Sequence, residues 1–222
     1  MPNCYQATDN HQAIANTLYQ RADFNIAKTA IVYCCFNQFC KIDASLFNIW
    51  MGILQKVPNS ILWLLADNNI AINNLRQQAL KYNISTNRLV FAKRLPKIKH
   101  LARMQLADIA LDTFTYNGHT TTTDALWAGI PVITLQGNHF ASRVSASLLK
   151  AINMPSLITT NKQDYKQLAI KLATNSKLLK KTKLHINYNK HHAMLFNTKQ
   201  FASDLEQIYK KIYTAKIMQS TT

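Results

Sequence analysis

Short apolar runs alternate along the chain with longer segments in which apolar side chains recur every three or four residues. The short runs are rich in β-branched and aromatic residues, which is typical of buried strands, and they cover residues 29–36, 60–67, 88–95, 108–113, 130–135 and 156–160. The segments between them have helical periodicity and cover residues 43–57, 69–84, 97–108, 120–129 and 139–152. Two more helical stretches, roughly 162–187 and 197–217, follow the last run.

The ends of these segments carry the residues that helix ends favour. Asp43 or Ser45 can cap the helix predicted over 43–57, and Gly129 follows the helix predicted over 120–129 at the position where glycine commonly closes a helix. The segment 43–57 also shows the clearest amphipathic spacing, with apolar side chains at Leu46, Ile49, Trp50, Ile53 and Leu54.

Regular alternation of strands and helices predicts an α/β fold. It favours a Rossmann-like parallel sheet with helices on both faces, joined by right-handed crossovers. In such sheets, ligands bind outside the carboxyl ends of the strands. The first 28 residues are polar and weakly patterned, so we expect 1–28 to be an extension outside the core, 29–217 to form one lobe and 218–222 to be a tail.

The chain is strongly basic. Lys and Arg number 26 against 10 Asp and Glu, which gives a formal net charge of +16 at pH 7. This charge predicts an anionic partner, and a nucleotide, a phosphorylated substrate, nucleic acid or a membrane surface all qualify. The chain has no helix-turn-helix, RNP or zinc-finger signature, so we expect no specific nucleic-acid binding.

The cysteines and the absence of long apolar runs bear on compartment. Cys34 and Cys35 lie inside an apolar run, and neither they nor Cys4 and Cys40 form a CxxC pair, so we expect buried free thiols and no metal site. With no stretch of signal-peptide or membrane-spanning character, the chain is expected to be cytoplasmic.

The segment NGHTTTTDALWAG, residues 117–129, is the most distinctive motif. Gly118 permits an unusual backbone conformation or the close approach of a ligand, and the four threonines from Thr120 open a helix. The free N–H groups and partial positive charge of a helix start make an anion cradle, although threonines also cap helices without binding anything. Asp124 is open to two interpretations: favourable placement near a helix N-terminus, or acceptance of hydrogen bonds from a ribose.

Other polar side chains follow different strands at the same predicted edge. Gln38 and Lys41 follow the first strand, and Lys97 and His100 open the helix after the third. Lys41 can neutralise a phosphate and His100 can stack on a base, whereas the alternative for each is an ordinary surface side chain. Their convergence at one sheet edge favours a binding site.

Several separated blocks resemble one known family. YCCFNQFCKID, VPNSILWLLADN, LADIALDTFTYNGHTTTTDALWAGIPVIT, FASRVSASLL and LFNTKQF are similar, in order and spacing, to the C-terminal catalytic lobe of the O-GlcNAc transferase and SPINDLY family, glycosyltransferase family 41. The resemblance covers about residues 1–213, and the threonine-rich block is closer to bacterial members. It implies the nucleotide-binding lobe of a GT-B fold and inverting, metal-independent transfer of N-acetylglucosamine from UDP-GlcNAc to Ser or Thr hydroxyls of a protein.

The resemblance also implies roles for the phosphate-side residues. Lys41 matches the lysine that contacts the diphosphate, where a cation stabilises the leaving group, and is therefore the expected catalytic residue. Gln38 matches a neighbouring nucleotide contact. His119, Thr120 and Thr121 match the helix start that binds the pyrophosphate.

On the nucleoside side, Lys97 and His100 match groups around the uridine, and Asp124 matches the acid that binds the ribose. No cofactor beyond the donor substrate is expected. The family's N-terminal lobe and tetratricopeptide array have no counterpart in these residues, so we expect 1–28 to lead out of a missing lobe, which a second chain or self-association would have to supply. The alternatives are an inactive nucleotide-binding remnant or scaffold and a GDP-fucose-type O-fucosyltransferase lobe.

Overall fold

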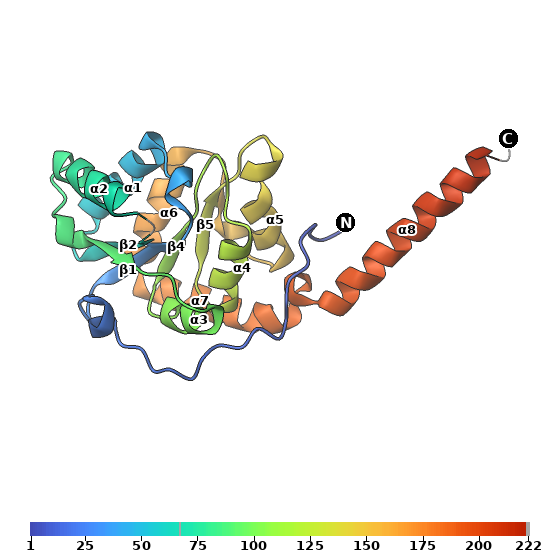
Figure 1. Ribbon diagram of the computed structural model, residues 1–222, viewed down its shortest axis with the longest axis horizontal. Helices are drawn as coiled ribbons and strands as arrows, with labels where there is room; N and C mark the ends of the chain where they lie inside the picture. Colours follow the sequence, from blue (N-terminus) through green and yellow to red (C-terminus); the bar gives the residue numbers. More distant parts are fainter. Residues whose placement is uncertain (67, 221–222) are drawn as a thin grey trace.

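The computed structural model describes residues 1–66 and 68–220, and within them it shows a six-stranded parallel sheet (Figure 1). The strand order is β3-β2-β1-β4-β5-β6. The strands are β1 (Ile31–Cys35), β2 (Ser60–Leu65), β3 (Leu89–Ala92), β4 (Ile109–Leu111), β5 (Val132–Leu135) and β6 (Ile158–Thr159). Each predicted strand is therefore present, and the Rossmann-like α/β prediction is confirmed. Residue 67, at the end of one predicted strand, and residues 221–222 of the predicted tail lie outside the described residues.

Helices cover both faces of this sheet. They are α1 (Ala44–Lys56), α2 (Asn69–Lys81), α3 (Lys97–Met104), α4 (Thr120–Trp127), α5 (Val144–Ala151), α6 (Lys162–Thr174), α7 (Ser176–His192) and α8 (Thr198–Ser220). Right-handed crossovers place α1 and α2 on one face, where α6 packs against α1, and place α3, α4 and α5 on the other. The carboxyl ends of β1 and β4 are neighbours at the centre of the sheet, where the chain reverses its direction of progress.

The helix-end predictions can be checked directly. The Asp43 carboxylate accepts the Leu46 N–H at 2.8 Å, so Asp43 rather than Ser45 caps α1. Gly129 has φ +84° and directly follows the C-cap of α4, which is the left-handed conformation that glycine adopts most easily. The single helix predicted over 162–187 is wrong, because Asn175 ends α6 and its side chain caps α7 by accepting the Leu178 N–H. The helix predicted over 139–152 is shorter, with a 3-10 turn (Phe140–Ser142) before α5.

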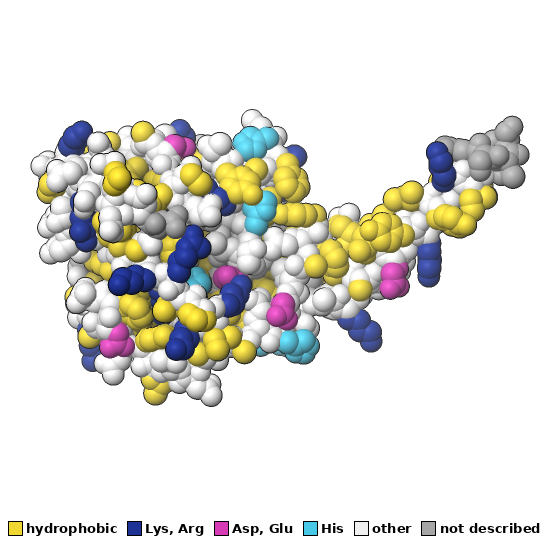
Figure 2. Space-filling model, in the orientation of Figure 1, with side chains coloured by type: hydrophobic (Ala, Val, Ile, Leu, Met, Phe, Trp, Pro, Cys, Tyr) yellow, Lys and Arg dark blue, Asp and Glu magenta, His cyan; other side chains and the backbone are white. Residues whose placement is uncertain are grey.

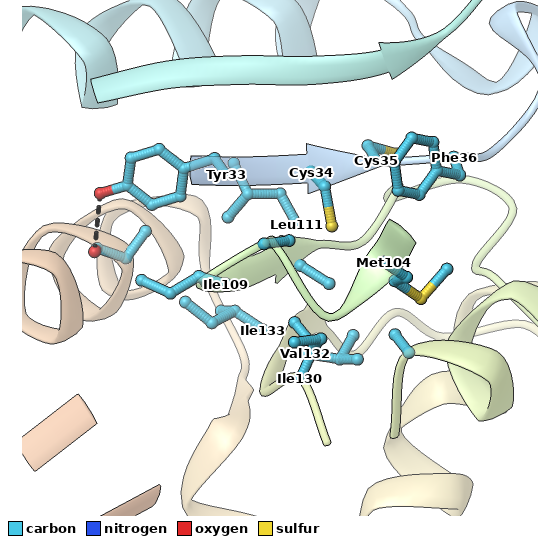
Figure 3. Close-up of a cluster of buried hydrophobic side chains, with 14 of the residues drawn as sticks. Tyr33, Cys34, Cys35, Phe36, Met104, Ile109, Leu111, Ile130, Val132 and Ile133 are labelled. Atoms are coloured by element: carbon cyan, nitrogen blue, oxygen red, sulfur yellow. Dashed lines mark hydrogen bonds between the residues drawn. The ribbon is translucent and has the colours of Figure 1, made fainter. Parts of the chain in front are cut away.

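The core lies between the sheet and its two helical layers (Figure 3). Tyr33 is fully buried, and its hydroxyl donates to the Ala169 carbonyl of α6 at 3.0 Å, so even the polar atom of this core side chain is satisfied. All four cysteines fall within the described residues and are free. Burial raises the pKa of the Cys34 and Cys35 thiols, which keeps them protonated and makes them small apolar core residues.

The N-terminal segment is more than an external linker. Cys4 and Ile26 belong to the core cluster, and the Trp127 indole donates to the Gln12 carbonyl at 2.9 Å. Residues 1–28, predicted to be an extension, therefore contribute two apolar side chains to the core, and hydrogen bonds to Ile98 of α3 and Trp127 of α4 attach the segment to the lobe. Arg21 adds an ion pair with Asp108 at 2.8 Å.

At the other end of the chain, α8 projects away from the body of the lobe (Figure 1). None of the helices in the described residues combines the length and apolar character needed to span a membrane.

Candidate nucleotide-binding site

The candidate site is built around the loop between β4 and α4, residues 112–119, which we call the Gly118 loop. Asp112 directly follows β4, and its Oδ1 atom accepts the Gly118 N–H at 2.7 Å. A Cβ atom at Gly118 would lie 2.5 Å from the Thr122 hydroxyl oxygen and 2.6 Å from that of Thr121. The φ of Gly118 is not in the left-handed region, so its backbone conformation does not require glycine. Glycine is required because the first turn of α4 approaches too closely for a Cβ atom.

α4 begins at Thr120, and in the described chain the side chain of its N-cap, His119, does not cap it. The Thr122 and Thr123 N–H groups bond to the His119 carbonyl, both at 3.1 Å, which leaves those of Thr120 and Thr121 pointing out of the helix start. Three of the four threonine hydroxyls are already used within the lobe. Thr121 donates to Asn37, Thr122 pairs with a serine of α5 and Thr123 bonds back to the Thr120 carbonyl. An anion at this helix start would therefore meet backbone N–H groups first.

Lys41 lies beside this helix start. Its ammonium group donates to the Asn117 carbonyl at 3.0 Å and lies 3.8 Å from the centre of the Tyr116 ring. Burial lowers the pKa of Lys41, while the nearby Asp112 carboxylate opposes that shift. Gln38 is exposed and lines the same hollow of about 380 Å³ as Lys41 and Tyr116. This hollow therefore contains a cation, an amide and an aromatic ring close to α4.

His119 lies among aromatic side chains and close to Lys41. Its Nδ1 atom is 3.0 Å from the Tyr5 hydroxyl, and the rings of Tyr116 and Phe140 pack around it. Burial lowers the pKa of His119, and the positive charge of Lys41 lowers it further. Its Nε2 atom is buried and has no hydrogen-bond partner among the described residues, so one polar atom at the helix start is unsatisfied.

A second hollow, of about 420 Å³, lies between α3, α4 and residues 6–13 of the N-terminal segment. Lys97 and Asp124 line it and form an ion pair, with the Asp124 side chain only 8% exposed. Burial raises the pKa of Asp124, and the hydrogen bond and charge of Lys97 oppose that rise. Thr120 and Thr123 line the same hollow, so it adjoins the start of α4.

His100, in the first turn of α3, is half-buried. Its Nδ1 atom accepts the Arg103 Nε–H at 3.0 Å, and its ring lies edge-on to Phe36, with 4.9 Å between ring centroids. Burial lowers the pKa of His100 to about 4, with smaller contributions from Arg103 and Lys97. The imidazole is therefore neutral at physiological pH, with its proton on Nε2.

The structure thus places Gln38 and Lys41 in one hollow and Lys97, Thr120 and Asp124 in the other, whereas the other predicted site residues, His100, His119 and Thr121, line neither. Figure 2 shows Lys and Arg side chains gathered on this face around α3, with few carboxylates among them. Within residues 1–66 and 68–220, no group of three or more His, Cys, Asp or Glu side chains has an arrangement that could hold a metal ion.

Sequence reasoning missed several residues that shape the site. Asp112 carries a detectable signal, since a carboxylate directly after a buried strand falls at the ligand-binding edge. Asn37 carries the same signal, because it follows β1 directly before Gln38. Ser145 shows no such signal, because it lies inside α5 and reaches Thr122 from there. Tyr5 lies in the segment taken as an extension.

These features define an α/β lobe with a helix start, a lysine and an acid–lysine pair at the central edge of its sheet. The chain belongs to glycosyl transferase family 41, whose family model matches residues 3–205.

Relatives support this assignment. The chain is 36% identical over 196 residues to the UDP-N-acetylglucosamine–peptide N-acetylglucosaminyltransferase of Caenorhabditis elegans, an alignment that covers 88% of the chain and 17% of the relative. It is 33% identical over 219 residues to the probable UDP-N-acetylglucosamine–peptide N-acetylglucosaminyltransferase SEC of Arabidopsis thaliana, covering 96% of the chain and 22% of the relative. The chain therefore spans about a fifth of the length of these relatives.

Solved structures show the same lobe. A variant of the O-GlcNAc transferase of Thermobaculum terrenum superposes with a TM-score of 0.77 and 26% identity, covering 86% of this chain and 38% of that one. HepE of Anabaena, solved in complex with UDP and glucose, superposes with a TM-score of 0.63 at 14% identity over 84% of this chain and 51% of that one, which shows a shared fold alone.

Proposed function

We propose that this chain is the donor-binding lobe of a protein O-GlcNAc transferase, which binds UDP-GlcNAc at the carboxyl edge of its sheet. The observation that carries the proposal is the placement of Lys41 beside the uncapped start of α4, in a chain of family 41. A diphosphate is the anion that best matches two backbone N–H groups, a helix dipole and one ammonium group at a single point.

The two hollows bind different parts of the donor. The diphosphate lies against the α4 start, with contacts from Lys41, His119, Thr120 and Thr121, and Gln38 flanks it from the exposed side of the first hollow. The nucleoside lies toward the second hollow. There Asp124 accepts hydrogen bonds from the ribose hydroxyls and Lys97 contacts the uridine. The neutral His100, three residues after Lys97 in α3, also contacts the uridine.

The same geometry can assist glycosyl transfer. Negative charge develops on the diphosphate as its bond to the sugar breaks, and fixed positive groups aimed at that point lower the barrier. Lys41 and the α4 N–H groups are held in place before any ligand arrives, so they stabilise this charge without reorganising. An acceptor hydroxyl that attacks from the opposite face of the sugar inverts the anomeric centre.

Sugar transfer also requires a site that holds the acceptor hydroxyl. A Ser or Thr hydroxyl must be held about 3–3.5 Å from the reacting carbon, and correct placement supplies roughly 7–11 kcal/mol of barrier lowering. The described residues build a donor site on an open sheet edge, so a second lobe or a second chain is needed to hold the acceptor. We therefore expect these 222 residues alone to bind donor without transferring sugar at an appreciable rate.

The donor assignment is tested by a thermal-shift panel of UDP, GDP, CDP and ADP on the purified chain. A ligand that binds only the folded state raises its stability, so UDP is expected to raise the melting temperature most. Best protection by GDP would replace the assignment with a fucosyl-type donor, and protection by none of the four would contradict nucleotide binding. Short duplex DNA serves as the comparison for the net charge, because non-specific binding to it weakens steeply with salt.

Transfer itself is tested by mass spectrometry. The chain is incubated with UDP-GlcNAc and a Ser/Thr-rich peptide, and the expected result is an unchanged peptide mass. A gain of one N-acetylhexosamine that disappears in Lys41→Ala would show that this lobe suffices for transfer.

A further inference from the structure

Both backbone polar groups of Gly118 are held by buried side chains from other positions. The Gly118 N–H donates to Asp112 Oδ1 at 2.7 Å, and the Gly118 carbonyl accepts the Ser145 hydroxyl at 2.9 Å. Asp112 is 2% exposed and Ser145 is fully buried, so neither side chain reaches a bound ligand. Any influence that they have on the site passes through the loop that they hold.

Each of these two side chains is itself fixed by a second contact. The other carboxylate oxygen of Asp112 accepts the Thr134 hydroxyl of β5 at 2.7 Å. The Ser145 hydroxyl oxygen lies 2.8 Å from that of Thr122 in the first turn of α4. The Asp112 carbonyl also accepts the Tyr165 hydroxyl of α6 at 2.9 Å. The clamp on Gly118 is therefore tied to β5 and to three helices of the lobe.

The clamped residue lies between the two parts of the phosphate side. On one side of it, the Asn117 carbonyl accepts from Lys41, and on the other, the carbonyl of the N-cap residue His119 accepts N–H groups from the first turn of α4. A shift of Gly118 would therefore move the ammonium group and the helix start relative to each other. Electrostatic stabilisation depends on donors being fixed in advance to within about half an ångström.

We propose that Asp112 and Ser145 are positioning residues that set the geometry of the diphosphate-binding loop through Gly118. This inference rests on the proposed function, since it assigns to the pair a role in binding the phosphates of the same donor. The nucleoside-side groups Lys97 and Asp124 join α3 to α4 by their own ion pair, so the clamp acts on phosphate affinity and leaves nucleoside affinity largely intact.

The test compares UDP with uridine, which lacks the diphosphate. UDP affinity is measured by calorimetry and uridine affinity by ligand-observed NMR, which reads weak binding. Ser145→Ala and Asp112→Ala are each expected to weaken UDP by about tenfold, because each removes one hydrogen bond to the loop, while uridine stays within about twofold. Asp112→Asn keeps one acceptor oxygen for the Gly118 N–H and is expected to retain most of the UDP affinity.

Asp108→Asn is the matched control. Asp108 directly precedes β4 at the opposite edge of the sheet and pairs with Arg21 and Lys183, so its loss destabilises the fold without touching the Gly118 loop. It is expected to lower the melting temperature and to leave UDP affinity unchanged. If Asp112→Ala does not fold, Ser145→Ala carries the test, with Asp112→Asn beside it.

The outcomes distinguish UDP binding by the chain from the positioning role of Asp112 and Ser145. Failure of the wild-type chain to bind UDP would overturn the proposed function, and this inference with it. UDP binding that Ser145→Ala leaves unchanged, or equal losses of UDP and uridine affinity, would overturn the positioning role alone.

Discussion

The ammonium group of Lys97, in the first turn of α3, forms an ion pair with the nearly buried carboxylate of Asp124 in α4. The pair connects two helices that follow different strands, and it lines the second hollow of the site. One carboxylate oxygen of Asp124 accepts from Lys97, and burial separates this carboxylate from bulk water.

Asp124→Asn is expected to weaken UDP and uridine by the same factor, about tenfold, because a hydrogen bond from a ribose hydroxyl to a charged acceptor is lost in both complexes. Calorimetry for UDP and ligand-observed NMR for uridine check this. A loss confined to UDP would move Asp124 from the ribose to the phosphate side of the site.

Lys41→Ala is expected to do the opposite, weakening UDP by about tenfold or more and leaving uridine within about twofold, because the ammonium group lies on the phosphate side. Lys28→Ala is the matched control, since Lys28 is an exposed lysine just before β1, at the other edge of the sheet. The same calorimetric titration at two salt concentrations separates a direct contact from a general effect of net charge. Equal losses in both variants would remove Lys41 from the site.

Gly118→Ala is expected to lower the free energy of unfolding by about 1–3 kcal/mol and to weaken UDP, because the new methyl group meets the hydroxyl oxygens of Thr121 and Thr122. Gly52→Ala provides the comparison. At Gly52 the nearest atom, 2.5 Å from the added Cβ, is the flexible Lys166 ammonium nitrogen, and alanine favours the helix by up to about 1 kcal/mol. Urea unfolding should therefore show opposite signs for the two variants, and a stable Gly118→Ala protein would contradict the packing of the loop.

His100 is expected to remain neutral down to about pH 4, because burial and two neighbouring cations lower its pKa from 6.5 to about 4. The unfolded chain binds a proton at His100 below pH 6.5, so the stabilisation from this group is present above that pH and is lost as pH falls toward 4. Nitrogen-15 NMR of the imidazole, with the other histidines in the same spectrum for comparison, reports both its titration and the predicted Nε2–H tautomer. A titration midpoint near 6.5 would show that the ring is not buried as described.

Asp112 is expected to produce a pH dependence of the opposite direction. Burial raises its pKa from 3.8 to about 6, against the hydrogen bonds from Gly118 and Thr134. The folded state therefore binds a proton that the unfolded state has released between about pH 4 and 6, and the free energy of unfolding contributed by this group falls as pH rises through that range. Asp112→Asn lacks this titration.

The difference in free energy of unfolding between wild type and Asp112→Asn, measured in urea from pH 4.5 to 7, isolates this effect. The groups that interact with the Asp112 carboxylate from neighbouring elements, Lys41 and Cys35 among them, are common to both proteins. The wild type should lose stability relative to the variant as pH rises. A difference that stays constant across the range would show that Asp112 does not titrate there.

The layers of this protein follow from local patterns in its sequence. Short apolar runs and helical patterns are local properties, so the strands, a cap at Asp43 or Ser45, the closing glycine Gly129 and the α/β class could be predicted from neighbouring residues alone. The site edge followed as well, because parallel strands place their carboxyl ends together. Where local signals were weak, as at Asn175, the helix boundaries were wrong.

Which polar groups remain accessible to a ligand depends on how the helices and strands pack together. Four consecutive threonines look alike in sequence, yet three of their hydroxyls are used inside the lobe by partners that include Asn37 and Ser145. The N-terminal segment is predicted to be an extension because its own composition is polar, whereas hydrogen bonds to Ile98 of α3 and Trp127 of α4, far along the chain, hold it to the lobe. Contacts between residues distant in sequence leave no periodic trace, and for that physical reason the clamp on Gly118 became visible only once β4, β5 and α5 were packed together.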